Sequence, residues 1–295
     1  MTLIDNVRKY ATNEFKFLVW KVNRRIRNTV TVHTKQGLLT VFASDPEIGR
    51  ELICNGAYEF DLTLRVQRFL QNHDRVSGGT ILDIGANMGV ISIGMIYNHF
   101  AERAIAIEPD PHNFALLKHN VEQNGMSDKI ICVRMAVSDV KNKLDFELSH
   151  DNFGDRRIRT KTNESYPELY GESSRQVIEV EADCLDNILQ TLPNAYTDDI
   201  RLIWLDTQGH EGKIFLGGKQ TFSRDIPVIS ELWPYGIART GMNDELFCDI
   251  AKELWSSYWV TRRGKFFRYP ISMLNLFIEE LGHGYDYESV IFTKF

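Results

Sequence analysis

The chain has 295 residues, a length that suits one large α/β domain or one domain with an appendage. Hydrophobic residues make up 43% of the chain and charged residues 25%, with 8 prolines, which is typical of an ordinary globular protein. The net charge of −6 argues against nucleic acid as the main partner, because phosphate binding requires a surplus of basic residues.

Cysteine usage and hydropathy indicate a compartment. Cys54, Cys132, Cys184 and Cys248 are far apart and form no C-x-x-C pair, which predicts reduced thiols and no zinc site. No apolar run approaches the roughly 18 residues that span a bilayer, and the first residues lack a cleavable signal pattern. We therefore expect a cytoplasmic protein.

Residues 1–28 are predicted to form an amphipathic helix. The segment carries seven bases and two acids, so its charge is +5 and the remainder of the chain carries −11. Three interpretations stay open: the helix docks on its own domain, pairs with a second subunit as a homodimer, or lies on an anionic membrane surface. A β-hairpin over residues 29–43 follows, and we expect residues 1–44 to be an appendage to a domain over residues 45–295. The apolar positions recur at three- and four-residue steps, at Ile4, Val7, Ala11, Phe15, Leu18, Val22 and Ile26.

The stretch T-I-L-D-I-G-A-N-M-G-V-I-S, from Thr80 to Ser92, predicts a strand, a tight turn and a helix. Gly85 and Gly89 permit the turn and allow the backbone to approach a ligand closely. Asp83 would repel a pyrophosphate but attract a cationic ligand with an amino-acid head. This pattern favours S-adenosylmethionine (SAM) over a dinucleotide.

Two more acids follow the next two predicted strands. Glu108 ends the strand over 104–107, at the spacing where nucleotide-binding βαβ units place an acid for the ribose hydroxyls. Asp139 follows a third strand over 129–137. It lies at the level expected for adenine, where either Asp139 or the backbone near Ala136 would meet the exocyclic amine.

A second chemical stretch, R-L-I-W-L-D-T-Q-G-H-E-G-K, runs from Arg201 to Lys213. A buried strand ends at Asp206, and Gly209 turns the chain toward His210 and Glu211. Because the carboxyl ends of parallel strands meet at one edge of a sheet, we expect Asp206 to share a crevice with the other strand-end acids.

Other segments are candidates for the walls of this crevice. Tyr58 and Glu59 lie in a loop ahead of the glycine turn and either close over the ligand or mark ordinary helix punctuation. A further strand ends at Glu231, followed by Trp233 at the same edge. The irregular region 152–177 suits either an anionic or polyhydroxylated acceptor or a solvated charge cluster. Its basic residues are Arg156, Arg157, Arg159 and Lys161.

With these motifs the sequence resembles the FkbM-type family of class I SAM-dependent methyltransferases. The resemblance covers roughly residues 45–235. The matching segments are G-A-Y-E at 56–59, L-D-I-G-A-N-M-G at 82–89, I-E-P-D at 107–110, A-V-S-D at 136–139, L-D-T-Q-G-H-E at 205–211 and E-L-W-P at 231–234.

The resemblance implies a Rossmann-like, seven-stranded, mostly parallel sheet with an antiparallel last strand and helices on both faces. It implies SAM as methyl donor, S-adenosylhomocysteine as product, and O-methylation of a hydroxyl on a small-molecule or glycan acceptor, such as a sugar or secondary metabolite. The cofactor-binding residues that it implies are Glu59, Asp83, Gly85, Asn87, Gly89, Glu108, Pro109 and Asp139.

For the chemistry we expect in-line methyl transfer, with His210 or Glu211 as the base and Asp206 orienting the acceptor or partnering His210. A divalent metal at Asp206 and Glu231 is an alternative, but the sequence offers too few oxygen ligands to assign one. A NAD-type Rossmann oxidoreductase and a non-catalytic SAM-fold interaction module are the rival hypotheses. The residues expected to bind the acceptor are Arg156, Arg157, Glu231 and Trp233.

Overall fold

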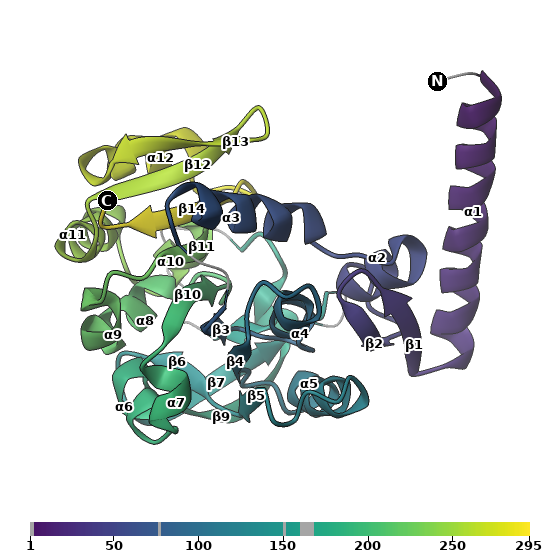
Figure 1. The fold of residues 1–295 in the computed structure, drawn as a ribbon, viewed down its shortest axis with the longest axis horizontal. Helices are drawn as coiled ribbons and strands as arrows, with labels where there is room; N and C mark the ends of the chain where they lie inside the picture. The colour runs from purple at the N-terminus through teal and green to yellow at the C-terminus, as the bar shows by residue number, and fades with distance from the viewer. Residues whose placement is uncertain (1–2, 76–77, 150–151, 160–167) are drawn as a thin grey trace.

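A twisted central sheet organises the protein (Figure 1). The computed structural model describes residues 3–75, 78–149, 152–159 and 168–295, with side chains described from residue 14 onward. The parallel strands are β3 (Thr80–Ile84), β4 (Arg103–Ile107), β5 (Ile130–Val133), β10 (Ile200–Leu205) and β11 (Val228–Leu232). The remaining strands, which pair antiparallel with their neighbours, are β12 (Ser257–Arg262), β13 (Lys265–Pro270) and β14 (Glu288–Thr293), so β13 and β14 run against the parallel strands and β12 runs with them.

Within the described residues this sheet has eight strands, in the order β13-β12-β14-β11-β10-β3-β4-β5. The predicted Rossmann-like α/β class and the antiparallel last strand, β14, are confirmed, whereas the sheet has one strand more than the expected seven. The additional strand is β13, an edge strand whose residues are exposed or half-buried. Because β13 buries no complete face, it lacks the alternating hydrophobic pattern that reveals most strands.

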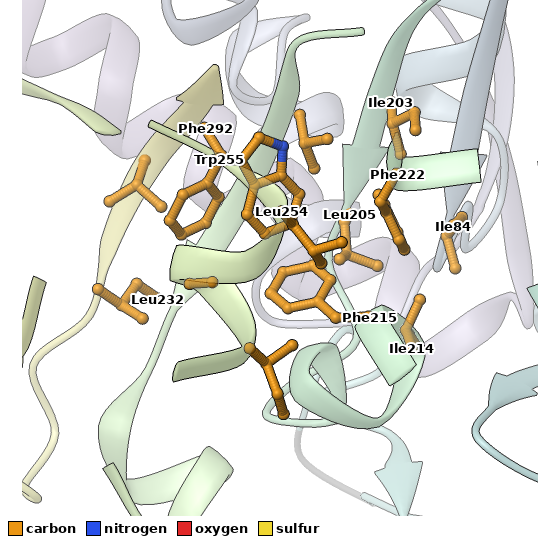
Figure 2. Close-up of a cluster of buried hydrophobic side chains, with 14 of the residues drawn as sticks. Ile84, Ile203, Leu205, Ile214, Phe215, Phe222, Leu232, Leu254, Trp255 and Phe292 are labelled. Atoms are coloured by element: carbon orange, nitrogen blue, oxygen red, sulfur yellow. The ribbon is translucent and has the colours of Figure 1, made fainter. Parts of the chain in front are cut away.

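Helices cover both faces of the sheet, and alternate residues of each strand face opposite layers. Leu82 and Ile203 belong to one buried cluster, whereas their neighbours Ile81 and Leu202 belong to the other. Figure 2 shows the first cluster, in which Phe215 packs with Trp255 and Phe292. One layer contains α6 (Leu185–Gln190), α8 (Glu211–Gly217), α9 (Lys219–Ser223), α11 (Asp244–Leu254) and α12 (Leu274–Leu281), and the other contains α3 (Phe60–Asn72), α4 (Val90–Tyr97) and α5 (Pro111–Gln123).

A second sheet was not predicted. The expected strand over 129–137 is interrupted: β5 ends at Val133, and the chain enters the second sheet at Ala136. Apolar residues on both sides of Arg134 give this stretch the pattern of one strand. The described strands of the second sheet, in the order β6-β9-β7-β8, are β6 (Ala136–Ser138), β7 (Asn142–Leu148), β8 (Arg157–Ile158) and β9 (Gln176–Cys184).

The predicted N-terminal helix and hairpin are present as α1 (Leu3–Ile26), β1 (Thr29–Thr34) and β2 (Gly37–Phe42). The hairpin is joined to the domain, because the Asn120 side chain accepts a hydrogen bond from Thr40 N–H and donates one to its carbonyl. The division of the chain at residue 44 stays a prediction. The remaining helices are α2 (Ile48–Asn55), α7 (Asn194–Thr197) and α10 (Pro234–Arg239), with 3₁₀ turns at Glu172–Ser174 and Ile271–Met273.

No helix in the described ranges combines the length and the apolar character needed to cross a membrane.

In the turn after β3, glycine is required by packing between loops, whereas the sequence suggested that it allows a ligand to approach closely. Gly85 has φ +87°, and a Cβ atom added there would overlap the carbonyl oxygen of Asp206, which follows β10. At Gly89, with φ +90°, an added Cβ would lie 2.7 Å from Leu117 Cδ1. Gly85 therefore allows two neighbouring strand-end loops to pack against each other.

We expect Gly85→Ala to lower the free energy of unfolding by at least about 3 kcal/mol, because it combines a left-handed backbone with a backbone clash. Gly125→Ala is the matched control: Gly125 has φ +65° with no atom within 4 Å of an added Cβ. The control should lose only roughly 1 kcal/mol through backbone strain. Urea unfolding measures both values, and equal losses would show that the contact with Asp206 is unimportant.

Candidate active site

A cavity of about 520 Å³ opens at the carboxyl ends of β3, β4, β10 and β11, and loops from the second sheet complete its wall. This volume lies in the range of small-molecule and cofactor sites. Three predicted site residues, Gly89, Asp139 and Glu211, are not part of the lining. The predicted site residues that do line the cavity are Glu59, Asp83, Gly85, Asn87, Glu108, Pro109, Arg156, Arg157, Asp206, His210, Glu231 and Trp233.

Asp83 lies on β3 at the start of the glycine turn and is almost completely buried. Its Oδ2 atom accepts hydrogen bonds from Ser92 N–H at 3.1 Å and from Ser92 Oγ at 2.6 Å. Burial raises the pKa of Asp83 to about 7, because few waters solvate the charge. A cation in the cavity would favour its ionised form.

Glu108 follows β4 and is held by two backbone donors. Asn87 N–H donates to Oε2 at 2.9 Å, and Asp110 N–H donates to Oε1 at 2.8 Å. Burial, and then the nearby Asp110 carboxylate, raise the pKa of Glu108 to about 8. Each carboxylate oxygen keeps a further lone pair for another donor. Asn113, which sequence analysis missed, also lines the cavity, and among the described residues its buried Oδ1 has no hydrogen-bond partner.

Asp139 does not reach the cavity wall, in contrast to its expected place beside adenine. It pairs with Lys213 at 3.0 Å and accepts a hydrogen bond from Ser138 Oγ at 3.2 Å. Burial raises its pKa, but the hydrogen bond and charge of Lys213 outweigh that effect, so the pKa is lowered overall. The entry of β6 into the second sheet draws this carboxylate toward α8. Ala136 and Val137 line the cavity instead, which leaves the backbone near Ala136 as the expected adenine contact.

His210 precedes α8 and is 7% exposed. Its Nε2 lies 3.0 Å from Ser138 Oγ. Because Ser138 donates its hydroxyl hydrogen to Asp139, we assign His210 Nε2–H as the donor to Ser138. Nδ1 then carries a lone pair and has no partner among the described residues. Burial lowers the pKa of His210 to about 4, so the imidazole is neutral at pH 7.

Asp206 and Glu231 form a carboxyl pair at the ends of β10 and β11. The Gln208 side chain bridges them, since its Nε2 donates to Asp206 Oδ1 and to Glu231 Oε2, each at 2.7 Å. Burial, and then the adjacent Asp206 carboxylate, raise the pKa of Glu231 well above its usual range. Burial also raises the pKa of Asp206. Because two neighbouring carboxylates repel each other, ionisation of one disfavours ionisation of the other.

Three non-glycine residues of the cavity wall have positive φ angles, namely Glu59 at 49°, Asn87 at 49° and Gln208 at 57°. Such backbone conformations are strained and cluster at functional sites. Sequence patterns give no signal for these conformations.

The pKa of Glu59 is raised by burial of its carboxyl group and, to a smaller extent, by the charge of Asp206. The residue as a whole is exposed, so solvent screens part of this effect.

Glu211 is fully buried away from the cavity lining. Its Oε1 accepts hydrogen bonds from Thr207 N–H at 3.0 Å and from Thr207 Oγ1 at 2.9 Å. It therefore fastens the loop after β10 to the first turn of α8. This placement argues against the expected role of Glu211 as a base.

The arginines of the cavity wall, expected either to bind an anionic or polyhydroxylated acceptor or to form a solvated charge cluster, are paired with acids. Arg156 pairs with Asp110 at 2.5 Å and lies over the Phe153 ring. Arg157 bonds Glu147, Asp155 and Glu172, and its guanidinium lies 5.0 Å from the centre of the Trp233 ring. Arg159 is not part of the lining, and Lys161 lies outside the described residues. No excess positive charge is left in the described wall for an anionic acceptor.

Over the described residues, no group of three or more histidine, cysteine, aspartate or glutamate side chains is arranged to hold a metal ion.

Comparison with known proteins places this site in a family. The family model described as the methyltransferase FkbM domain matches residues 83–264, which is more than half of the chain. The chain belongs to the FkbM methyltransferase family. It is therefore a SAM-dependent methyltransferase, and the matched region contains the glycine turn, Glu108, Asp206 and Glu231.

Individual relatives of this FkbM methyltransferase are distant. The 2-O-methyltransferase NoeI of Sinorhizobium fredii is 26% identical over 174 residues, which cover 57% of this chain and 69% of that protein. The structure of methyltransferase FkbM from Methylobacillus flagellatus KT is 14% identical, with a TM-score of 0.42, and the match covers 73% of this chain. The tRNA methyltransferase TrmK of B. subtilis is 12% identical, with a TM-score of 0.38 and 77% of this chain covered. The chain spans 43% and 64% of these two chains, respectively.

The buried carboxyl groups predict that the free FkbM methyltransferase becomes less stable as pH rises. Burial raises the pKa of Glu211 from its ordinary 4.5 to about 7. The folded state therefore binds this proton more tightly than the unfolded state. The resulting stabilisation is fully present below pH 4.5 and is lost as pH rises through 7. We expect Glu211→Gln to reduce the difference in free energy of unfolding between about pH 5 and about pH 8, measured by urea unfolding.

Glutamine at 211 keeps the acceptor for Thr207 and removes the titrating group. Because Glu211 is not part of the lining, methyl transfer by this variant should stay within about threefold of the parent, well short of the loss expected for a catalytic base. A profile as steep as the parent's would show that Glu211 does not titrate between these pH values.

Proposed function

We propose that this FkbM methyltransferase transfers the methyl group of SAM to a hydroxyl of a sugar, glycan or secondary metabolite. The observation that carries the proposal is the carboxyl pair Asp206 and Glu231, bridged by Gln208, on the wall of the cavity. The relative NoeI is named a 2-O-methyltransferase, which supports transfer to oxygen.

The residues of the other half of the cavity fit SAM. Glu108 presents two fixed oxygens for vicinal ribose hydroxyls, and the buried Asn113 Oδ1 still needs a donor. Asp83 supplies a carboxylate for a cationic amino-acid head, and the backbone at Ala136 is available to adenine. When bound, SAM supplies an electrophilic methyl group on a positively charged sulfur.

The carboxyl pair suits the task of removing a proton from the acceptor. A neutral hydroxyl is a poor nucleophile, so its proton must pass to a base as the oxygen–methyl bond forms. The ionised member of the pair has a pKa raised by burial, which makes it a stronger proton acceptor than an exposed carboxylate. Gln208 holds both carboxyl groups in place. His210, with its pKa near 4, is the weaker candidate for this role.

The wall beside this pair favours a neutral, polyhydroxylated acceptor. Arg156 and Arg157 are already paired with acids, so an anionic group would gain little there. Trp233 contributes an indole whose buried Nε1 has no acceptor among the described residues, and Tyr170 packs edge-on against its ring. A ring with hydroxyl groups can offer both apolar contact and an acceptor for this N–H.

Incubation with labelled SAM and a panel of neutral sugars, glycans and hydroxylated metabolites, followed by mass spectrometry, tests the reaction. We expect label on oxygen, together with release of S-adenosylhomocysteine. Methylation of amines alone would contradict the proposal.

We expect Asp206→Asn to reduce turnover at least about a hundredfold, because the amide cannot accept the hydroxyl proton. The affinity for SAM, measured by calorimetry, should change by less than about threefold, since the change is at the acceptor side. Asp139→Asn is the matched control, because Asp139 is not part of the lining. Full activity of Asp206→Asn, or an equal loss in Asp139→Asn, would favour the chain of Asp139, Ser138 and His210 as the proton acceptor.

Replacing Glu108 with glutamine should weaken SAM binding at least about tenfold, because one acceptor for the ribose hydroxyls becomes a donor. Glu211→Gln serves as the control, since it also neutralises a buried carboxyl group but is not part of the lining. Calorimetry with SAM gives both dissociation constants. Unchanged affinity in Glu108→Gln would place the ribose elsewhere.

A further inference from the structure

Over residues 14–26, whose side chains are described, α1 contacts the protein by one side. Figure 1 shows the helix at the right-hand edge, beside α2 and the β1–β2 hairpin and away from the central sheet. Trp20 is 3% exposed and anchors this side, and the Lys16 carbonyl accepts a hydrogen bond from Cys54 Sγ of α2 at 3.5 Å. The other sides of this part of the helix are exposed.

An apolar stripe runs along one of these free sides. Phe15, Leu18, Val22 and Ile26 recur at three- and four-residue steps, so they share a face, and they are 48–69% exposed. Val19 is also exposed next to them. Single exposed apolar residues are common, but a continuous row on one helix indicates an interaction surface.

Basic side chains border this stripe on one edge. Successive helical residues are rotated by about 100°, which places Lys21 and Arg25 along that edge, whereas Lys16 lies nearer Trp20, on the side that contacts α2. Among the described residues, no carboxylate forms an ion pair with Lys21 or Arg25. Lys21 instead lies over the Phe17 ring, 4.4 Å from its centre.

We propose that α1 lies on an anionic lipid surface, with the apolar stripe between the lipid chains and the bordering cations at the level of the phosphates. An apolar stripe bordered by basic side chains is the pattern of helices that lie in a membrane interface. Lys and Arg near an anionic surface each add to binding. The remainder of the chain, at −11, is repelled by such a surface, so contact is confined to the edge where α1 stands.

A second copy of the chain is a poorer occupant of this face. Two α1 helices packed along their stripes would bring their basic borders together. In the part of α1 with described side chains, Glu14 is the single acid available to offset them. Like charges brought together between two helices repel each other and destabilise the contact.

The test uses the full-length protein with two kinds of vesicle, phosphatidylcholine alone and phosphatidylcholine mixed with phosphatidylglycerol, and measures binding by co-sedimentation. We expect at least about tenfold tighter binding to the anionic vesicles, weakened strongly between about 0.1 M and 0.5 M salt. Equal binding to both vesicles, or no binding to either, would overturn the proposal.

Two α1 variants separate the contributions. Leu18→Ser with Val22→Ser removes apolar contact, and Lys21→Glu with Arg25→Glu reverses the charge of the basic border. Each pair should reduce binding to anionic vesicles at least about tenfold. The apolar control replaces Leu246 and Leu276 with serine, because these leucines of α11 and α12 are 48% and 53% exposed, and it should bind like the parent.

Light scattering on the same proteins decides between lipid and a second copy. We expect a molecular mass that does not depend on Leu18 and Val22. The stripe would instead belong to a subunit interface if the parent were a dimer that dissociates in the Leu18→Ser/Val22→Ser variant while every variant bound vesicles like the parent. S-adenosylhomocysteine release by each variant should equal that of the parent, since α1 contributes no residue to the cavity lining.

Discussion

The structure depends on the close packing of the loops that follow β3 and β10. Gly85 has no side chain, so the Asp206 backbone lies directly against it. A larger residue would separate the two loops and move Asp206 away from the wall that it shares with Asp83 and Glu108. Because β3 and β10 are paired and parallel, their ends lie at one edge, and the glycine sets how closely the acids converge there.

This convergence makes charge the main constraint of the cavity. Asp83, Glu108 and Glu231 line one cavity, and burial of their carboxyl groups raises the pKa of each. Without a ligand, the folded protein holds protons that an unfolded chain would release at neutral pH. A cationic ligand favours the ionised carboxylates, so its binding and proton release are linked. The same burial that weakens the free protein at high pH thus prepares the site for a cation.

Acids at the ends of clearly apolar strands could be predicted from the sequence, because a buried strand and its end leave a strong pattern. Asp83, Glu108, Asp206 and Glu231 are such acids, and all four line the cavity. The sequence could not place Asp139 and Glu211 outside the lining, because their positions depend on the second sheet and on a hydrogen bond from Thr207. Gln208 was missed as well, since its role requires a positive φ angle and two partners 2 and 23 positions away in sequence.

The net charge of the chain conceals the separation of its charges. A sum of −6 predicts weak attraction to any polyanion, yet the first 28 residues carry +5, and α1 stands at the edge of the molecule. Basic residues alone would suit nucleic acid and anionic lipid equally, because both present phosphates. The apolar stripe of α1 distinguishes them: burying Phe15, Leu18 and Ile26 between lipid chains is favourable, whereas a phosphate backbone offers those side chains no comparable apolar surface.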